Sequence, residues 1–207
     1  MAIPRNLSNL APGASTTGVL AVTNGGSGAN TLTGVLKGNG TSAFSAASAG
    51  ADYVAPSTPT TFTATQTFSG SSSAIAAVFA DAGEVVTVSA TAATGTINYD
   101  VTTQSVLYYT TNASGNFTMN FRGSAGTSLN TLLSTGQSVT VAFLNTNGGT
   151  AYYNSAVQVD GSSVTPKWQG GTAPTSGNAS SIDIYVYTII KTGSAAFTVA
   201  ASQTKFA

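Results

Sequence analysis

The stretch SIDIYVYTIIK, residues 181–191, decides the fold class because its residues alternate in character with a period of two. An extended chain places successive side chains on opposite faces. One face of this strand is aliphatic: Ile182, Ile184, Val186 and Ile190. The other face carries charged and aromatic side chains: Asp183, Tyr185, Tyr187 and Lys191. Because charged side chains are rarely fully buried, we expect the aliphatic face to meet the core and the tyrosines to lie outside it.

The same alternation recurs through the second half of the chain. Seven further segments have strand character: 96–101, 105–110, 116–122, 138–144, 156–160, 164–168 and 195–202. Residues rich in Gly, Asn and Ser separate them, and residues 128–137 are the one plausible helical turn. This spacing is typical of a sandwich of antiparallel strands. We therefore predict an all-β protein with an antiparallel, jelly-roll-like β-sandwich head over residues 96–207.

The first half of the chain has a different composition. Few of the aromatic residues lie before position 96, and residues 1–60 are rich in Gly, Ser, Thr and Pro. Aromatic side chains dominate core energetics, so residues 1–60 are expected to form an extended segment that is ordered only within an assembly. Residues 61–95 are expected to be a β connector. Within it, residues 71–83 suit either a short helix with a Ser cap or a β connector.

Composition excludes several classes of function. The 207 residues contain no His and no Cys, which removes Ser-His-Asp triads, Cys nucleophiles and His or thiolate metal sites. Only 6% of residues are charged and the net charge is zero, so no basic stripe is present for nucleic acid or a membrane surface. No cofactor is expected. A neutral surface favours association with other protein chains.

The glycine-rich stretch NGGSGANTLTGVLKGNG, residues 24–40, superficially resembles a phosphate-binding loop. A P-loop needs Gly-Lys followed by Ser or Thr, whereas Lys37 is followed by Gly38 and Asn39. A dinucleotide fingerprint needs a third glycine leading into a helix, and neither feature follows Gly28. The stretch is therefore interpreted as a series of turns separated by short apolar segments.

Carboxylates are the remaining candidates for catalysis. A glycosidase uses two carboxyl groups about 5–9.5 Å apart. Asp81 and Glu84 are the only close pair in sequence and fit a turn, and Asp160 with Gly161 fits a hairpin turn. No pair is marked out by its surroundings, so we expect no enzyme. Glycan cleavage stays open as an alternative.

Aromatic residues near the predicted loops and on the polar face of 181–191 are the candidates for binding. They are Tyr152, Tyr153, Trp168, Tyr185 and Tyr187. Tyrosine and tryptophan are frequent in subunit interfaces, and they can also stack on sugars while their polar edges form hydrogen bonds. We expect a subunit contact at Tyr185 and Tyr187, with a host-surface glycan as the alternative ligand.

Long phrases of this chain resemble virion proteins of tailed phages. Residues 1–50, MAIPRNLSNLAPGASTTGVLAVTNGGSGANTLTGVLKGNGTSAFSAASAG, look like the N-terminal segment of tail-fibre and appendage proteins, with Ser27 where Thr is usual. Residues 98–123 and 157–207 are similar to a β-domain of cyanophage and other marine-phage structural proteins. The resemblance covers most of the chain and is weakest over 61–95. It carries no catalytic residues.

This resemblance implies a β-rich fibre, usually a homotrimer, that is assembled in the host cytoplasm and attached to other virion proteins. The apolar residues expected to pack in the trimer or against the particle are Leu7, Leu10, Val19, Leu20, Leu32, Val35, Leu36 and Phe44. A capsid decoration protein or head fibre is the first alternative, and a tailspike-type glycan depolymerase is the second. An ion on the trimer axis also stays open.

Overall fold

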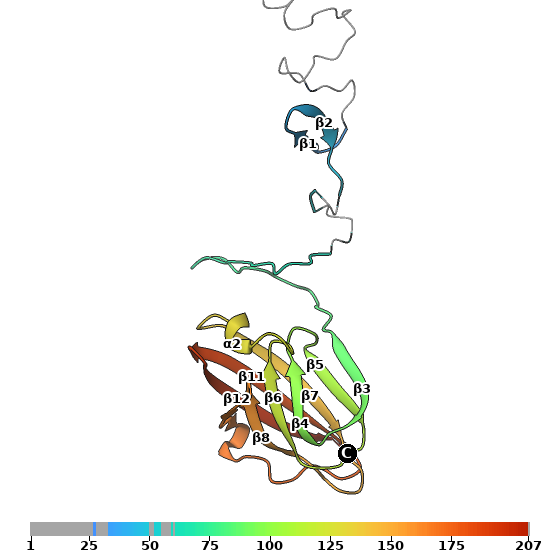
Figure 1. Ribbon diagram of the computed structural model, residues 1–207, viewed down its shortest axis with the longest axis vertical. Coiled ribbons are helices and arrows are strands. Elements are labelled where there is room, and N and C mark those ends of the chain that lie inside the picture. The colour runs from blue at the N-terminus through green and yellow to red at the C-terminus, as the bar shows by residue number, and fades with distance from the viewer. Residues whose placement is uncertain (1–26, 28–32, 50–51, 55–58, 60, 207) are drawn as a thin grey trace, which may run out of the picture. The chain divides into compact units, whose positions relative to one another are not determined.

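The computed structural model describes residues 27, 33–49, 52–54, 59 and 61–206. The chain divides into two compact units, Met1–Val78 and Phe79–Ala207 (Figure 1). Strands dominate the described residues, and the helical segments among them are the four-residue α2 (Leu129–Leu132) and the three-residue η2 (Gln169–Gly171). The all-β prediction is confirmed.

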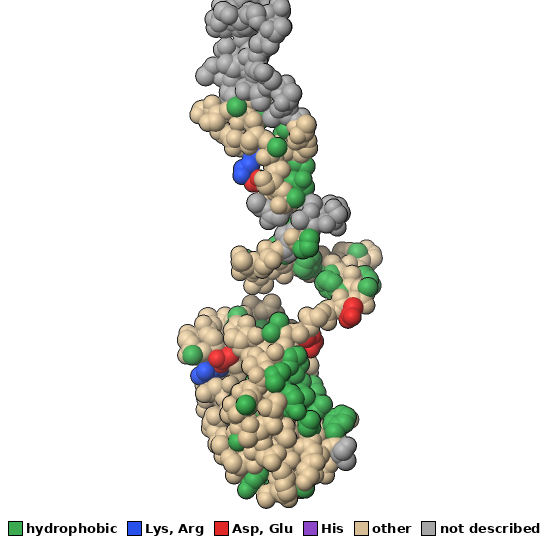
Figure 2. Space-filling view, turned by 90° about the vertical axis from the view of Figure 1, so that its right-hand side faces the viewer, with side chains coloured by type: hydrophobic (Ala, Val, Ile, Leu, Met, Phe, Trp, Pro, Cys, Tyr) green, Lys and Arg blue, Asp and Glu red, His purple; other side chains and the backbone are tan. Residues whose placement is uncertain are grey.

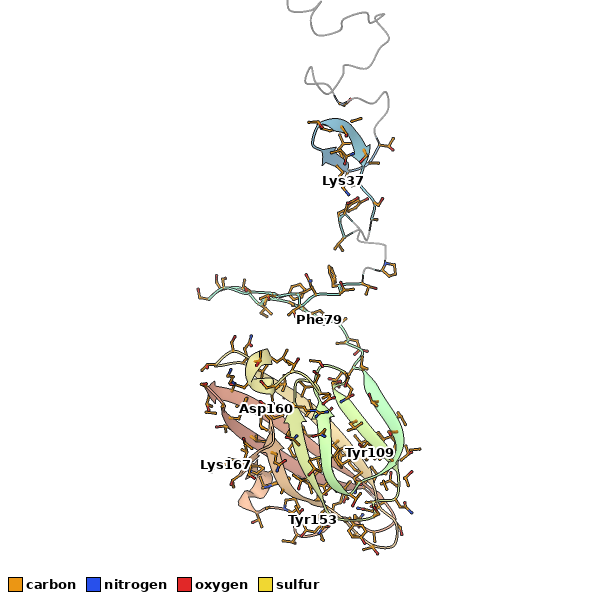
Figure 3. The ribbon with its side chains drawn as sticks, in the orientation of Figure 1. Lys37, Phe79, Tyr109, Tyr153, Asp160 and Lys167 are labelled. Carbon is orange, nitrogen blue, oxygen red and sulfur yellow. The ribbon has the colours of Figure 1, made fainter. Side chains whose placement is uncertain are left out.

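Among the described residues of the N-terminal unit, β1 (Leu36–Asn39) and β2 (Ser42–Ala46) form an antiparallel hairpin. Gly40 has φ +60° in the two-residue turn, a backbone conformation that residues with a Cβ rarely adopt. Lys37 (labelled in Figure 3), whose glycine-rich surroundings suggested a phosphate loop, lies on β1. Its ammonium pairs with the carboxylate of Asp52. The lysine is thus part of a local ion pair beside a hairpin.

The C-terminal unit contains two sheets. The six-stranded sheet has the order β10-β12-β11-β7-β5-β3 and the four-stranded sheet the order β4-β6-β8-β9. The strands of the first are β3 (Val86–Ala92), β5 (Val106–Thr111), β7 (Ser138–Thr146), β10 (Lys167–Trp168), β11 (Ile182–Gly193) and β12 (Ala196–Phe206). Those of the second are β4 (Gly95–Asp100), β6 (Phe117–Arg122), β8 (Asn154–Val159) and β9 (Ser162–Val164). The first strand, β3, lies inside the range 61–95 that was expected to be a connector.

The strand directions correct the antiparallel, jelly-roll-like prediction. From β3 to β8 the chain alternates between the sheets, so that β3, β5 and β7 are parallel in one and β4, β6 and β8 in the other. Antiparallel pairing is found for β7 with β11, β11 with β12, and β8 with β9. Period-2 alternation reports which side chains share a face but not strand direction. The connections between consecutive strands from β3 to β8 therefore pass from one sheet to the other.

One buried cluster joins the inner faces of both sheets. Phe117 of β6 is 1% exposed, and its ring packs edge-on against Phe143 of β7 and Tyr185 of β11, with centroids 5.4 and 5.7 Å away. Phe121 of β6 packs against Tyr187 of β11 at 4.8 Å. Edge-to-face aromatic pairs add about 0.5–1.5 kcal/mol each to the burial of their area. This cluster holds the two sheets together.

The faces of β11 are the reverse of those predicted from residues 181–191. Asp183, Tyr185, Tyr187 and Ile189 are 0% exposed and face the core, whereas Val186 is 37% exposed. Burial of both side chains is possible because each has hydrogen-bond partners: the Lys191 ammonium donates to the carbonyl oxygens of Asn130 and Leu133, and Asp183 Oδ2 accepts from Asn147. The prediction that the tyrosines lie outside the core is wrong.

The short helix α2 occurs within the range predicted for a helical turn, and a distant carboxylate caps it. Asp160 accepts hydrogen bonds from the backbone N–H groups of Leu129 (2.7 Å) and Asn130 (2.9 Å) (Figure 3). Asp160 and Gly161 both have positive φ in the two-residue connection between β8 and β9, which confirms the predicted Asp-Gly hairpin turn. The turn thus also places a negative charge at the start of α2.

Candidate functional site

The outer face of the six-stranded sheet is apolar over four neighbouring strands. Its side chains, here called the apolar face, are Val86, Val88, Val106, Tyr108, Ala142, Leu144, Ile184 and Val186. Strand register places them in two rows, one running from Val86 to Val186 and the other from Val88 to Ile184. Val86 is 49% and Val88 64% exposed, and hydrophobic side chains gather on the flank of this unit in Figure 2. Contiguous exposed apolar surface of this kind marks interaction sites.

The apolar face carries no charged side chain at the outward positions of β3, β5, β7, β11 and β12. Lys167 of β10, whose partner in the sheet is Ala200, lies at the far end of the same sheet. Two such faces could therefore meet without placing like charges together. Charged residues are depleted at the centres of protein interfaces, where they would be removed from water.

Both sheets end at the same side of the C-terminal unit. β3 is the last strand of the six-stranded sheet and β4 the last of the four-stranded sheet, and only residues 93–94 separate them in the chain. An edge strand presents N–H and C=O groups that another chain can pair with. β3 combines this edge with the exposed Val86 and Val88, which makes it the strand best suited to an intermolecular contact.

The N-terminal unit also exposes large hydrophobic side chains. Of the residues predicted to pack in an assembly, Val35, Leu36 and Phe44 are exposed by 51%, 48% and 41%. The other five, Leu7, Leu10, Val19, Leu20 and Leu32, lie outside the described residues. Further along, Phe62, Phe68 and Ile75 are exposed by 53%, 63% and 81%. Neither unit therefore buries its full apolar content within the described part of the chain.

Trp168 borders three neighbouring hollows of about 680, 390 and 280 Å³. Its ring packs edge-on against the buried Tyr187 at 6.2 Å, which fixes one side of the indole. Polar side chains line the hollows: Ser155, Ser163, Lys167, Gln169 and Gln203. An aromatic surface bordered by hydroxyl, amide and ammonium groups is suited to a polar ligand such as a sugar.

The other predicted aromatic site residues do not join Trp168 at one surface. Tyr185 and Tyr187 belong to the core, and burial raises the pKa of both hydroxyls above the ordinary value of 10.0. The Tyr187 hydroxyl donates to Asn154 Oδ1 at 3.1 Å. Tyr152 is partly buried against the core, and the backbone N–H of Tyr153 donates to Asn116. Of the five residues, Trp168 is the one that lines the three hollows described above.

Asp100, Asp160 and Asp183 have separate structural partners, whereas Asp81 and Glu84 are exposed and accept hydrogen bonds from the Ala82 N–H and the Ser105 hydroxyl. Asp100 pairs with Arg122, and this pairing raises the pKa of the guanidinium. Asp160 caps α2, and Asp183 Oδ2 accepts hydrogen bonds from Asn147, Asn178 and Gln203. Within the described residues, no group of three or more His, Cys, Asp or Glu could hold a metal ion. That part of the chain also has no helix long and apolar enough to cross a membrane.

Sequence reasoning missed the apolar face. Val86 and Val88 already show period-2 alternation in GEVVTVSA, residues 83–90, but the segment was assigned to a connector because few aromatics surround it. Comparison with family models, curated proteins and solved structures gives no match to this chain.

Proposed function

We propose that this protein is a non-enzymatic structural component of a phage virion, a fibre or appendage that assembles through its own exposed apolar surfaces. The observation that carries the proposal is the apolar face, which is uncharged, contiguous and placed beside an open sheet edge. The resemblance of residues 1–50 to tail-fibre and appendage proteins is the reason for proposing a phage virion as the particle. In this proposal the two packed sheets form a β-sandwich head and residues 1–60 form the attachment and shaft segment.

Assembly as a homotrimer is the state that the fibre resemblance favours. Sedimentation equilibrium of the full chain is expected to give three times the chain mass of 20.5 kDa. Antibody labelling of intact particles is then expected to mark the tail. Labelling of the shell would favour the decoration or head-fibre alternative. A chain that stays monomeric and is found on no particle would contradict the proposal.

A second function, contact with a host-surface glycan, is favoured by the hollows around Trp168. Replacing Trp168 with Ala removes the stacking surface and is expected to weaken binding of host-cell polysaccharide about tenfold or more. Tyr153→Ala, on the same unit but outside these hollows, serves as the control. Binding can be measured by titration calorimetry with polysaccharide purified from the host. Equal affinities for wild type and Trp168→Ala would exclude this surface.

The depolymerase alternative requires a pair of carboxyl groups free to act on a sugar. In the C-terminal unit Asp100, Asp160 and Asp183 are instead engaged in an ion pair, a helix cap and a buried hydrogen-bond network, which leaves the exposed Asp81 and Glu84 as the pair to test. These roles support a non-enzymatic protein. Release of reducing sugar from host polysaccharide by the wild type, abolished by Asp81→Asn or Asp183→Asn, would contradict it.

A further inference from the structure

Where the start of β11 pairs with β7, the described residues include two buried oxygen atoms without a hydrogen-bond donor. Among the described residues, Asp183 Oδ1 and Asn145 Oδ1 have no hydrogen-bond partner, and both residues are 0% exposed. Asp183 and Asn145 are directly paired across β11 and β7, and both point into the core. Side chains opposite each other in an antiparallel pair have Cβ atoms about 4.5–5.5 Å apart. A buried acceptor without a donor costs about 1–3 kcal/mol, so two adjacent ones indicate a missing hydrogen.

Rotating the amides does not supply this hydrogen. Asn147 Nδ2 donates to the Tyr152 carbonyl oxygen and to Asp183 Oδ2, each at 3.1 Å, so its orientation is fixed by two acceptors. Asn147 Oδ1 must then accept from Asn145 Nδ2, at 3.0 Å. The second atom of the Asn145 amide is consequently an oxygen. Turning Asn145 over would place two oxygens together at Asn147.

The other oxygen of Asp183 is already saturated with donors. Asp183 Oδ2 accepts from Asn147 Nδ2, from the backbone N–H of Asn178 at 3.0 Å and from Gln203 Nε2 at 3.3 Å. The surroundings of this oxygen are crowded: a Cβ on Gly177 would lie 2.6 Å from Asp183 Oδ2 and 2.3 Å from the Tyr152 carbonyl oxygen. A carboxylic acid can accept at one oxygen and donate from the other.

We propose that Asp183 is a neutral carboxylic acid in the folded protein and donates its proton from Oδ1 to Asn145 Oδ1. One proton satisfies both unpartnered oxygens, and the three donors to Oδ2 keep their acceptor. The head then contains a buried site occupied by a proton, which makes its stability depend on pH in a direction opposite to that of an ion-paired Asp.

The charged and titratable groups around Asp183 are few. Lys205 is its partner on β12, but the Lys205 ammonium is exposed and donates to Ser176 Oγ at 3.2 Å. Tyr185 lies two residues along β11, and its hydroxyl accepts from Gln203 Nε2 and the Asn154 N–H. β7 and the loops at 147–152 and 176–178 supply amide and carbonyl groups. Burial is the largest influence on the Asp183 pKa and raises it above 3.8, against the smaller lowering effects of the hydrogen bonds and Lys205.

The sign of the pH effect follows from this raised pKa. The folded state holds the proton at pH values where the unfolded chain has released it. Folding is therefore favoured below the pKa of an unfolded Asp, and this contribution is lost as the pH rises through the folded pKa. The unfolding midpoint of the full chain is expected to fall over that window.

Asp183→Asn tests the assignment because an amide reproduces the neutral acid. Its oxygen can accept from the three donors and its NH₂ group can donate to Asn145 Oδ1. At neutral pH the unfolding midpoint of the variant is expected to equal or exceed that of wild type. The variant's midpoint is also expected not to fall as the pH rises. The matched control is Asp160→Asn, in which both carboxylate oxygens accept backbone N–H groups, so the same substitution loses a hydrogen bond and lowers the midpoint. Asn tolerates the positive φ of residue 160, so the turn itself is unaffected.

A second measurement keeps the proposal testable if the variant does not fold. The carboxyl ¹³C resonance of Asp183 in the wild-type chain is expected to titrate above 3.8. Titration at or below that value would overturn the proposal. A cation in place of the proton would also overturn it. In that case adding Na⁺, K⁺ or Ca²⁺ to chelator-treated wild type would raise the unfolding midpoint, and the same addition would not raise the midpoint of Asp183→Asn. Failure of trimer assembly would not bear on this result, since the site lies within one chain.

Discussion

Replacing Phe117 with Ala is expected to lower the free energy of unfolding of the C-terminal unit by about 3–5 kcal/mol, which is large against a typical total stability of about 5–15 kcal/mol. Phe117 is 1% exposed and contacts Phe143 and Tyr185 of the opposite sheet. Its removal leaves a cavity between two sheets whose strands are fixed by hydrogen bonding. The site can therefore close only in part.

Trp168 provides the measurement, because it is the only tryptophan and its ring lies against Tyr187 of the same core. Urea unfolding followed by its fluorescence gives the free-energy difference, at matched protein concentrations because the proposed assembly makes stability depend on concentration. The control is Leu132→Ala, at an α2 side chain that is 43% exposed, with an expected change of about 0.5 kcal/mol or less. Equal losses for both variants would show that the cluster around Phe117 does not hold the sheets together.

Period-2 alternation was sufficient to predict the all-β class and most strands after residue 95, and turn residues predicted the helical turn at α2 and the hairpin at Asp160, whereas β3 was placed in a connector. These features depend on local sequence, since turn residues and side-chain alternation act within a few positions. Strand direction is not local. β3 pairs with β5 and β5 with β7 only because the intervening strands cross to the second sheet, and no residue within a strand reports that crossing.

The inverted faces of β11 have a different origin. Their ionisable side chains suggested that Asp183 and Lys191 lie outside, but both are buried: the Lys191 ammonium donates to two carbonyl oxygens, and Asp183 Oδ2 accepts from the amides of Asn147 and Gln203. Those partners lie at positions 130, 133, 147 and 203, far away in sequence. The outward Ile and Val residues of the same strand follow from this reversal and contribute to the apolar face. A sequence with 6% charged residues leaves few polar side chains to mark the surface, so apolar character alone is a weak guide to burial here.

Placing Lys at both Val86 and Val88 is expected to separate the assembled protein into monomers. Both side chains point outward from the edge strand β3, and their exposure means that the monomer loses little packing when they change. Lys on an edge strand is compatible with the fold and is a common means by which proteins prevent edge-to-edge association. In an interface, however, each Lys would be removed from water opposite a face that offers no carboxylate to pair with it.

The expected effect is a weakening of association on the order of a hundredfold or more, which corresponds to about 2.7 kcal/mol or more. Sedimentation equilibrium of the full chain over a range of concentrations measures it, and thermal unfolding of the monomer checks that the fold is kept. Thr96→Lys with Ser162→Lys is the matched control, because it adds the same charge at two exposed positions of the four-stranded sheet. Loss of association in both variants would point to net charge rather than to the apolar face. If the Val86→Lys, Val88→Lys variant associates as strongly as wild type, the subunit contact lies elsewhere, on the exposed side chains of the N-terminal unit.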